Sequence, residues 1–316
     1  MQSLVDVREP VSSPRRIRFE RREVCPGCRS AHAKVAWRGR FSDEPVRSWL
    51  AWHHYAADVG FEVGDAPIDL ARCARCSLLF HRFVPDGPSL SRLYGTWIDD
   101  VQIERFEREQ GGLGPSQTRF ERARSMHRRL LRLHRLAGSP FPFRVLDFGC
   151  GDGVTLDVAD GLGFEAWGVD PSVTRTGRAR GGVRRILPSA EALQELGQPF
   201  DAVVLIEVLE HLVDPLGTLE ALARLVRPGG ALLVEVPDAR GWRGPPRTFE
   251  ALRVVQPLEH LNAFTPEVLA RTCRAAGFVP APRFAWSMRG EGPRGLASEL
   301  VSSLRPVGTR QYFSRS

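Results

Sequence analysis

The sequence contains almost no lysine and no long apolar run. Of its 44 basic residues only Lys34 is a lysine, and the others are arginine. No stretch approaches the roughly 20 consecutive apolar residues that a membrane-spanning helix requires, and the first residues lack the apolar core of a secretory signal. We therefore expect no membrane span and a cytoplasmic location. Disulfide bonds are not expected either, because thiols stay reduced in that compartment.

The arginine content is compatible with a nucleic-acid partner, because the formal net charge is +7 and basic surfaces attract phosphate. The basic residues are nevertheless spread along the chain, and no motif interleaves aromatic and basic residues for base stacking. The use of arginine in place of lysine throughout the chain is more typical of a bias in genomic base composition than of selection for phosphate contacts. We interpret the arginines mainly as solvated surface, and we keep a polymer partner only as an alternative.

Four of the six cysteines form two Cys-x-x-Cys pairs, which consist of Cys25, Cys28, Cys73 and Cys76. Two such knuckles supply four thiolates for a tetrahedral, structural zinc ion. The 44 residues between the pairs exceed the usual spacing of about 15–20, so we expect this insert to fold over with a helix or hairpin of its own. Redox chemistry and loss of the metal are the alternatives. His32 and His81 are substitute ligands, interpreted as polar surface residues.

Changes in pattern divide the chain into five parts. These are a loose lead-in at 1–22, a zinc-binding module at 23–85, a helical connector or lid at 86–140, an α/β domain at 141–285 and a C-terminal tail at 286–316. In the connector, apolar residues recur at helical spacing from Met126 to Leu136, and Gly138 ends the predicted helix. The tail is expected to add one helix and then fray.

From Phe143 onward, short apolar runs alternate with helical segments. The runs RVLDFG, EAWGVD, FDAVVLIEV and ALLVEVPD predict buried strands. Strands and helices that alternate at this spacing predict a parallel, doubly wound, Rossmann-like α/β sheet. Residues 266–277 predict a further helix, because proline begins the segment and glycine ends it. The sequence has no internal repeat.

A glycine loop follows the first predicted strand, at the strand end where doubly wound sheets bind ligands. In VLDFGCGDG, the residues Gly149, Gly151 and Gly153 allow a sharp turn and the close approach of a ligand. The NAD fingerprint GxGxxG fails, because Val154 occupies the position of its third glycine. The second strand ends at Asp170, whose carboxylate is suited to accept hydrogen bonds from ribose hydroxyls.

This GxGxG spacing resembles the first motif of class I S-adenosylmethionine (SAM) methyltransferases. PSAEAL at 188–193, FDAVVLIEVLEHLVDP at 200–215 and LARLVRPGGALLVEVPD resemble later segments of that family, in the same order. A Rossmann-like domain that binds another nucleotide, or none, is the alternative. The resemblance implies a cofactor site made of Asp147, Gly149, Cys150, Gly151, Gly153, Asp170, Pro171, Ser189, Ala190 and Glu207.

The resemblance also implies a role for several of these residues. Asp147 orients the methionine amino end of SAM, and Asp170 holds the ribose. Many relatives have an acidic residue where this chain has Ser189, so the adenine contact is expected from backbone amides around Ala190. Cys150 is interpreted as a small residue that lines the site, with a nucleophilic role as the alternative.

A zinc module in front of a SAM domain resembles the deoxysugar C-methyltransferases of natural-product pathways, over residues 23–285. Those enzymes carry a further C-terminal domain, whereas about 30 residues follow here, so part of their acceptor site has to be absent or replaced. The stretch PLEHLNAFTPEVL resembles their EHxxxFTxxxL segment. This likeness implies that His260 is the catalytic base or an acceptor ligand, with Glu259 beside it in the catalytic site; a structural histidine is the alternative.

Two further features concern the acceptor. His211, in LEHL after the fourth strand, is a second catalytic candidate, and packing beside SAM is its alternative. Tyr94 and Trp97 belong to a helical lid or to the core. We expect methyl transfer to a small-molecule acceptor, a sugar or a natural-product intermediate. An RNA or protein methyltransferase that grips a polymer with the zinc module and helix 121–136 is one alternative, and a non-catalytic SAM-binding protein is another.

Overall fold

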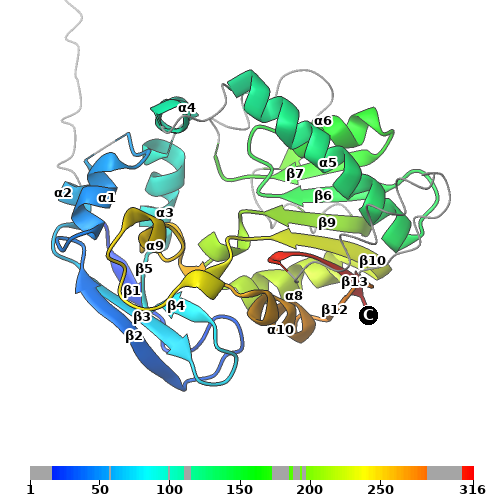
Figure 1. The fold of residues 1–316 in the computed structure, drawn as a ribbon. Helices are drawn as coiled ribbons and strands as arrows, with labels where there is room; N and C mark the ends of the chain where they lie inside the picture. Colours follow the sequence, from blue (N-terminus) through cyan, green and yellow to red (C-terminus); the bar gives the residue numbers. More distant parts are fainter. Residues whose placement is uncertain are drawn as a thin grey trace, which may run out of the picture.

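The computed structural model describes residues 16–56, 58–98, 100–109, 115–172, 185–187, 193, 197–282 and 308–316. Two lobes lie side by side, one around a small N-terminal sheet and one around a large sheet (Figure 1). Among the described helices, none is both long and apolar enough to cross a bilayer.

The large sheet has seven strands in the order β12-β13-β10-β9-β6-β7-β8. Strands β8, β7, β6, β9 and β10 are mutually parallel, as the alternating pattern predicts. The bounds of the strands are β6 (Arg144–Phe148), β7 (Glu165–Val169), β8 (Arg185–Leu187), β9 (Phe200–Ile206), β10 (Val226–Glu235), β12 (Phe278–Pro280) and β13 (Arg310–Arg315).

The predicted parallel sheet is mixed at one edge, because β13 runs antiparallel to both β10 and β12. These residues belong to the segment that was expected to fray. Phe313 is fully buried in the core on one face of the sheet. Tyr312 packs on the other face, where the Arg132 guanidinium lies 4.2 Å from its ring centroid. Burial on both faces holds this short polar strand in the sheet.

Helices cover both faces of the large sheet (Figure 1). On one face lie α5 (Pro115–Ala137) and α6 (Val154–Gly161), and on the other lie α8 (Pro215–Leu225) and α10 (Pro266–Ala275). Met126, Leu130 and Leu133 of α5 are buried against the sheet, so the helical periodicity of this segment is confirmed. Strands β7 and β8 lie on one side of β6 in the sheet, whereas β9 and β10 lie on the other side of β6. This reversal of strand order places a crevice at the carboxyl ends of β6 and β9.

The N-terminal lobe contains the insert between the cysteine pairs, which forms a hairpin that also carries two short helices. Its elements are β2 (Ala33–Arg40), α1 (Val46–Trp52), α2 (Val59–Val63) and β3 (Pro67–Cys73). The expectation of a helix or hairpin in this insert is therefore confirmed. The other elements of the lobe are β1 (Phe19–Arg21), β4 (Leu79–His81), β5 (Phe83–Pro85), α3 (Gly87–Arg92), the π-helical turn at Leu93–Trp97 and α9 (Phe249–Arg253). Helix α4 (Asp100–Glu109) connects the lobe to α5.

The two lobes share structure. Strand β11 (Asn262–Ala263), which follows the large sheet in sequence, pairs with β4 of the N-terminal lobe. Arg22 lies at this junction and donates hydrogen bonds to the carbonyls of His81 and Leu261 and to Oδ1 of Asn262. Burial lowers the pKa of the Arg22 guanidinium to about 9. The N-terminal lobe is therefore packed onto the α/β part through a buried polar junction.

Candidate functional site

The glycine loop lies between β6 and α6 in a conformation that requires glycine. Gly149, Gly151 and Gly153 have φ of +86°, +51° and +77°. A Cβ on Gly149 would overlap Cγ2 of Val208, whereas a Cβ on Gly151 would meet open space. The amides of Gly149 and Cys150 donate to the carbonyl of Val169 at the end of β7. The loop is thus folded back onto the neighbouring strand, as its sequence predicts.

Gly149→Ala is expected to destabilise the protein more than Gly151→Ala. Both variants place a Cβ in a left-handed backbone conformation, which costs about 1–2 kcal/mol. Only the first also forces Val208 to move, and such overpacking adds about 1–3 kcal/mol. Urea denaturation of both variants measures the difference. Equal losses in the free energy of unfolding would show that the Val208 contact is unimportant.

Asp170 connects the loop to the end of β7. Its carboxylate accepts a hydrogen bond from the amide of Gly151 at 2.8 Å and one from the amide of Ser172 at 2.8 Å. The residue is buried, and the exposed Pro171 follows it. A carboxylate has about four lone-pair sites, so Asp170 retains capacity for a ligand. Ser189 and Ala190 lie outside the described residues.

A cavity of about 460 Å³ opens between α5 and the carboxyl ends of the central strands. Four of the predicted site residues line it, which are Asp147, Gly149, Cys150 and Glu207. Burial raises the pKa of Asp147 to about 7, and a hydrogen bond with Thr155 opposes that shift. Burial also raises the pKa of the Cys150 thiol. A thiol that resists ionisation is a poor nucleophile, which favours the interpretation of Cys150 as a lining residue.

Helix α5 contributes cavity residues that the sequence analysis did not identify. Arg122, Ser125, Met126 and Arg129 line the cavity, and their spacing of three and four residues places them on one face of the helix. Arg129 forms an ion pair of 2.7 Å with Glu235 at the end of β10. The same helical periodicity that predicted α5 could therefore also have identified these cavity residues.

Glu207 follows β9 in a strained backbone conformation, with φ of +54°. Its amide donates to the carbonyl of Glu235 at 2.9 Å. Burial, followed by the charge of Glu235, raises the pKa of the Glu207 carboxyl to about 7. Positive φ in a residue other than glycine is typically kept where function requires it. Glu207 thus places a carboxylate that titrates near neutral pH in the cavity wall.

His211 and His260 lie together, with their ring centroids 5.1 Å apart. Tyr94 reaches them from the N-terminal lobe, and its hydroxyl lies 3.0 Å from Nδ1 of His211. Burial lowers the pKa of His260 to about 3. The carboxylate of Glu210 lies next to His211, with Oε1 3.7 Å from Nε2. The structure therefore brings both predicted histidines and Tyr94 into one polar cluster.

Glu259 and Trp97 lie apart from that cluster. The Glu259 carboxylate accepts a hydrogen bond of 2.7 Å from the Tyr55 hydroxyl and one of 3.2 Å from Nε2 of Gln256. It is thus bonded to the insert of the N-terminal lobe and not to the ring of His260. Trp97 is buried in the core of the same lobe, so the structure supports core packing and not a lid for this residue.

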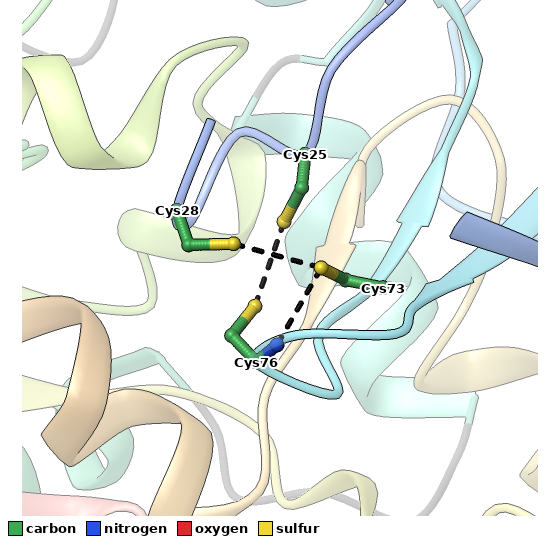
Figure 2. Close-up of side chains that lie close together, drawn as sticks. All are labelled: Cys25, Cys28, Cys73 and Cys76. Atoms are coloured by element: carbon green, nitrogen blue, oxygen red, sulfur yellow. Dashed lines mark hydrogen bonds between the residues drawn. The ribbon is translucent and has the colours of Figure 1, made fainter. Parts of the chain in front are cut away.

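The four paired cysteines converge on one point, as Figure 2 shows. Cys25 Sγ lies 3.5 Å from Cys76 Sγ, and Cys28 Sγ lies 3.5 Å from Cys73 Sγ. All four sulfurs lie within 4.8 Å of one another. A tetrahedral zinc ion with Zn–S of about 2.3 Å separates its sulfurs by about 3.8 Å. The described cysteines form no disulfide, and their arrangement fits a zinc ion.

The two knuckles have the same backbone geometry. The amide of Cys25 donates to the carbonyl of Ser30, and that of Cys73 donates to the carbonyl of Leu78, five residues on in each case. The residues after the second cysteines, Arg29 and Ser77, have φ of +57° and +70°. This repeated geometry turns both thiol pairs toward the same point.

The two histidines considered as substitute ligands lie outside the cluster of thiols. His32 is exposed, as expected of a surface residue. The interpretation of His81 as a surface residue is wrong, because its side chain is only 1% exposed. Its Nε2 lies 2.7 Å from the carbonyl of Val255, and burial lowers its pKa to about 4. His81 is therefore a neutral core histidine.

Known proteins match the segment of the chain that contains this site. A family described as a methyltransferase domain matches residues 117–281, which is just over half of the chain. A ubiquinone biosynthesis O-methyltransferase of Bordetella avium is 27% identical over 204 residues, covering 58% of this chain and 82% of that protein. A protein of Sinorhizobium medicae with the same name is 39% identical over 99 residues, covering 29% of this chain and 40% of that protein.

The chain spans only about two fifths of the length of several of these relatives. Among solved structures, a SAM-dependent methyltransferase from Archaeoglobus fulgidus has a TM-score of 0.45 and 19% identity, over 69% of this chain and 100% of that chain. The family match includes the glycine loop, Asp170 and the cavity strands. The chain therefore belongs to the methyltransferase-domain family.

Proposed function

We propose that this enzyme transfers the methyl group of SAM to a hydroxyl of a small molecule, a sugar or a natural-product intermediate such as a phenol. The observation that carries the proposal is Glu207, a carboxylate whose pKa is raised to about 7, in the wall of a cavity of about 460 Å³. Cavities of this size are typical of small-molecule sites. The relatives named ubiquinone biosynthesis O-methyltransferases support an oxygen acceptor.

The donor side of the cavity provides groups for the two ends of SAM. Bound SAM supplies an electrophilic methyl group on a sulfonium. Asp147 and Arg122 both line the cavity and are assigned to the amino and carboxylate groups of the methionine end. Asp170 is assigned to the ribose hydroxyls, because two backbone amides already fix its orientation. The adenine contact at Ser189 and Ala190 remains a prediction from the sequence.

Glu207 is the proposed base. An O-methylation requires that the acceptor hydroxyl lose its proton, and a base works best when its pKa lies near the working pH. The carboxyl of Glu207 meets that condition, whereas the pKa of His260 is lowered to about 3. His260, His211 and Tyr94 are assigned to holding the acceptor by hydrogen bonds. That His260 is itself the base, as the sequence suggests, is the competing hypothesis.

The four cysteines are proposed to bind a structural zinc ion, which offers no open position for chemistry. Both knuckles contact helices of the α/β part. The carbonyl of Pro26 accepts from the amide of Leu216 on α8, and the carbonyl of Cys76 accepts from Arg271 on α10. Zinc would therefore hold the N-terminal lobe against the domain that binds SAM.

A polymer acceptor has less support. The proposal for it relied on the arginines of helix 121–136, but α5 turns several of its arginines toward its own domain. Within that range, Arg122 forms an ion pair with Asp152, and Arg129 pairs with Glu235. Arg119, earlier in the same helix, pairs with Asp152 and Asp157. Charges that are already neutralised within the cleft contribute little to phosphate binding.

Transfer of label from SAM identifies the acceptor class. The purified protein is incubated with methyl-labelled SAM and, separately, with cell RNA, cell protein and pools of small phenols and sugars. Label is expected only in a small-molecule pool, and label in RNA or protein would contradict the proposal. Asp170→Ala is the matched control, because losing charged hydrogen bonds to the ribose costs about 1.5–3 kcal/mol each. That variant should bind SAM at least about tenfold more weakly.

A further inference from the structure

A second group of metal-ligating side chains lies outside the cysteine cluster. His53 and His54 follow α1 in the insert, and Glu259 precedes β11, about 200 residues later. The two imidazole rings are tilted at 37° to each other, with centroids 3.8 Å apart. One ligand atom of each residue lies within 4.8 Å of the others. Neither the proposed zinc knuckles nor the methyl-transfer site accounts for this group.

The distances within the group fit ligands that share an ion. Nε2 of His53 lies 3.5 Å from Oε1 of Glu259, and Nε2 of His54 lies 3.4 Å from the same oxygen. Both distances exceed the usual 2.7–3.2 Å of an N–H···O hydrogen bond. Ligands bound at about 2.0–2.2 Å to one tetrahedral ion are about 3.3–3.6 Å apart. The separations therefore match joint coordination better than direct hydrogen bonding.

Three of the four ring nitrogens of His53 and His54 lack a hydrogen-bond partner among the described residues. Both ring nitrogens of His53 and Nε2 of His54 are buried and form no hydrogen bond with any described residue. The side chains of His53, His54 and Glu259 are 9%, 16% and 7% exposed. Buried polar atoms without partners are rare and often mark an absent ion or water. An ion at the common point would satisfy one nitrogen of each ring.

The surroundings also suit a metal ligand set. Glu259 accepts hydrogen bonds from Tyr55 and Gln256, and Gln256 in turn accepts one from Nε1 of Trp49 at 3.2 Å. Carboxylate ligands of metals are typically oriented by such donors. The Trp49 ring lies 4.6 Å from the His53 ring between centroids, which fixes the imidazole. The group is thus held in place before any ion binds.

We propose that His53, His54 and Glu259 bind a divalent transition-metal ion of the zinc class. Two imidazoles and one carboxylate are a preferred ligand set for such ions. Three protein ligands leave one position of a tetrahedron for water or for an oxygen of a ligand. The ion would join the insert of the N-terminal lobe to the segment that carries His260. The proposal goes beyond the function above and does not depend on the identity of the acceptor.

Metal counting on the full chain tests the proposal. The protein is loaded with zinc, passed into metal-free buffer and analysed by atomic emission. The wild type is expected to keep about two equivalents and His54→Ala about one, as one of the two sites then loses a ligand. Tyr55→Phe keeps all three ligands but removes a donor to Glu259, so zinc at this site should bind about 10- to 100-fold more weakly. His127→Ala, at an exposed position of α5, is the matched control and should keep both ions.

Cobalt separates this site from the cysteines. With cobalt in place of zinc, His54→Ala should retain the thiolate-to-cobalt charge-transfer band of the cysteine site and lose only the weaker bands of the second ion. If His54→Ala and the wild type each hold about one ion, and that ion is lost in Cys73→Ser, the inference is overturned while the cysteine site stands. If the wild type holds one ion that is lost in His54→Ala and kept in Cys73→Ser, this inference stands and the cysteine site fails. Circular dichroism of each variant confirms that it is folded.

Discussion

Glu207→Gln is expected to lower kcat by about 100- to 10,000-fold, the usual contribution of a general base. The substitution keeps the size of the side chain and removes the proton acceptor from the cavity wall. SAM affinity, measured by titration calorimetry, should remain near that of the wild type, because Asp147 and Asp170 are unchanged. A loss of SAM affinity comparable to the loss in kcat would mean that Glu207 binds the donor and not the acceptor proton.

The pH dependence of this variant provides a second readout. Only the deprotonated form of Glu207 accepts a proton, and its pKa is raised to about 7 by burial and by Glu235. In the wild type, kcat should therefore rise with pH through about 7 and level off above it. The residual activity of Glu207→Gln should lack this step. A wild-type profile without a step near neutral pH would contradict the assignment.

His260→Ala is the comparison that separates the two candidate bases. If Glu207 is the base, removing His260 weakens acceptor binding, so KM rises more than kcat falls. If His260 is the base, kcat falls by the larger factor and Glu207→Gln has the milder effect. Because the pKa of His260 is lowered to about 3, its ring stays neutral above that pH. It would therefore produce no step in the profile near pH 7.

Cys73→Ser is expected to cause the largest loss of stability. Structural zinc sites contribute about 10–16 kcal/mol of binding free energy to folding in small zinc-binding peptides, and loss of a metal is among the few changes that cost more than about 4 kcal/mol. For a chain of this size, that corresponds to a fall in Tm of roughly 6 °C or more. Differential scanning calorimetry with and without a chelator measures it, and the chelator should lower the Tm of the wild type more than that of the variant.

Cys273→Ala is the matched control for that experiment. Cys273 is fully buried in α10 but does not belong to the cysteine cluster. Its replacement removes a thiol from the core and should leave the zinc content unchanged. If the wild type contains no zinc after purification and its Tm does not respond to a chelator, the four cysteines do not hold a structural metal.

The glycine loop could be predicted from the sequence, because its geometry depends only on residues that are close together in the chain. Gly149, Gly151 and Gly153 follow β6 directly, and each needs the left-handed backbone that glycine adopts without strain. Asp170 ends the next strand, and neighbouring parallel strands bring their carboxyl ends together. The two cysteine pairs are equally local, since each knuckle is set by hydrogen bonds within six residues. Short-range geometry of this kind is visible in a motif.

The residues of the proposed acceptor side could be predicted only in part from the sequence, because contacts between segments distant in sequence determine their positions. The motif drew attention to Glu259 and His260 as neighbours in sequence. In the structure, Glu259 contacts Tyr55 of the insert, whereas His260 lies next to His211. The same applies to β13, whose short polar sequence looked like a fraying end. Its pairing with β10 depends on burial of Phe313 under α/β core residues distant in sequence.

The sequence by itself determined the α/β fold, the glycine loop and the four cysteines that are proposed to hold zinc. Strand–helix alternation, glycine spacing and paired thiols are local patterns that constrain the backbone wherever they occur. Only the tertiary structure decided that the carboxyl groups of Asp147 and Glu207 have a pKa near 7, that His53 and His54 meet Glu259, and that the N-terminal lobe shares a strand with the α/β part. Those properties arise from burial and from contacts between segments up to 240 residues apart, and desolvation is a property of the packed molecule alone.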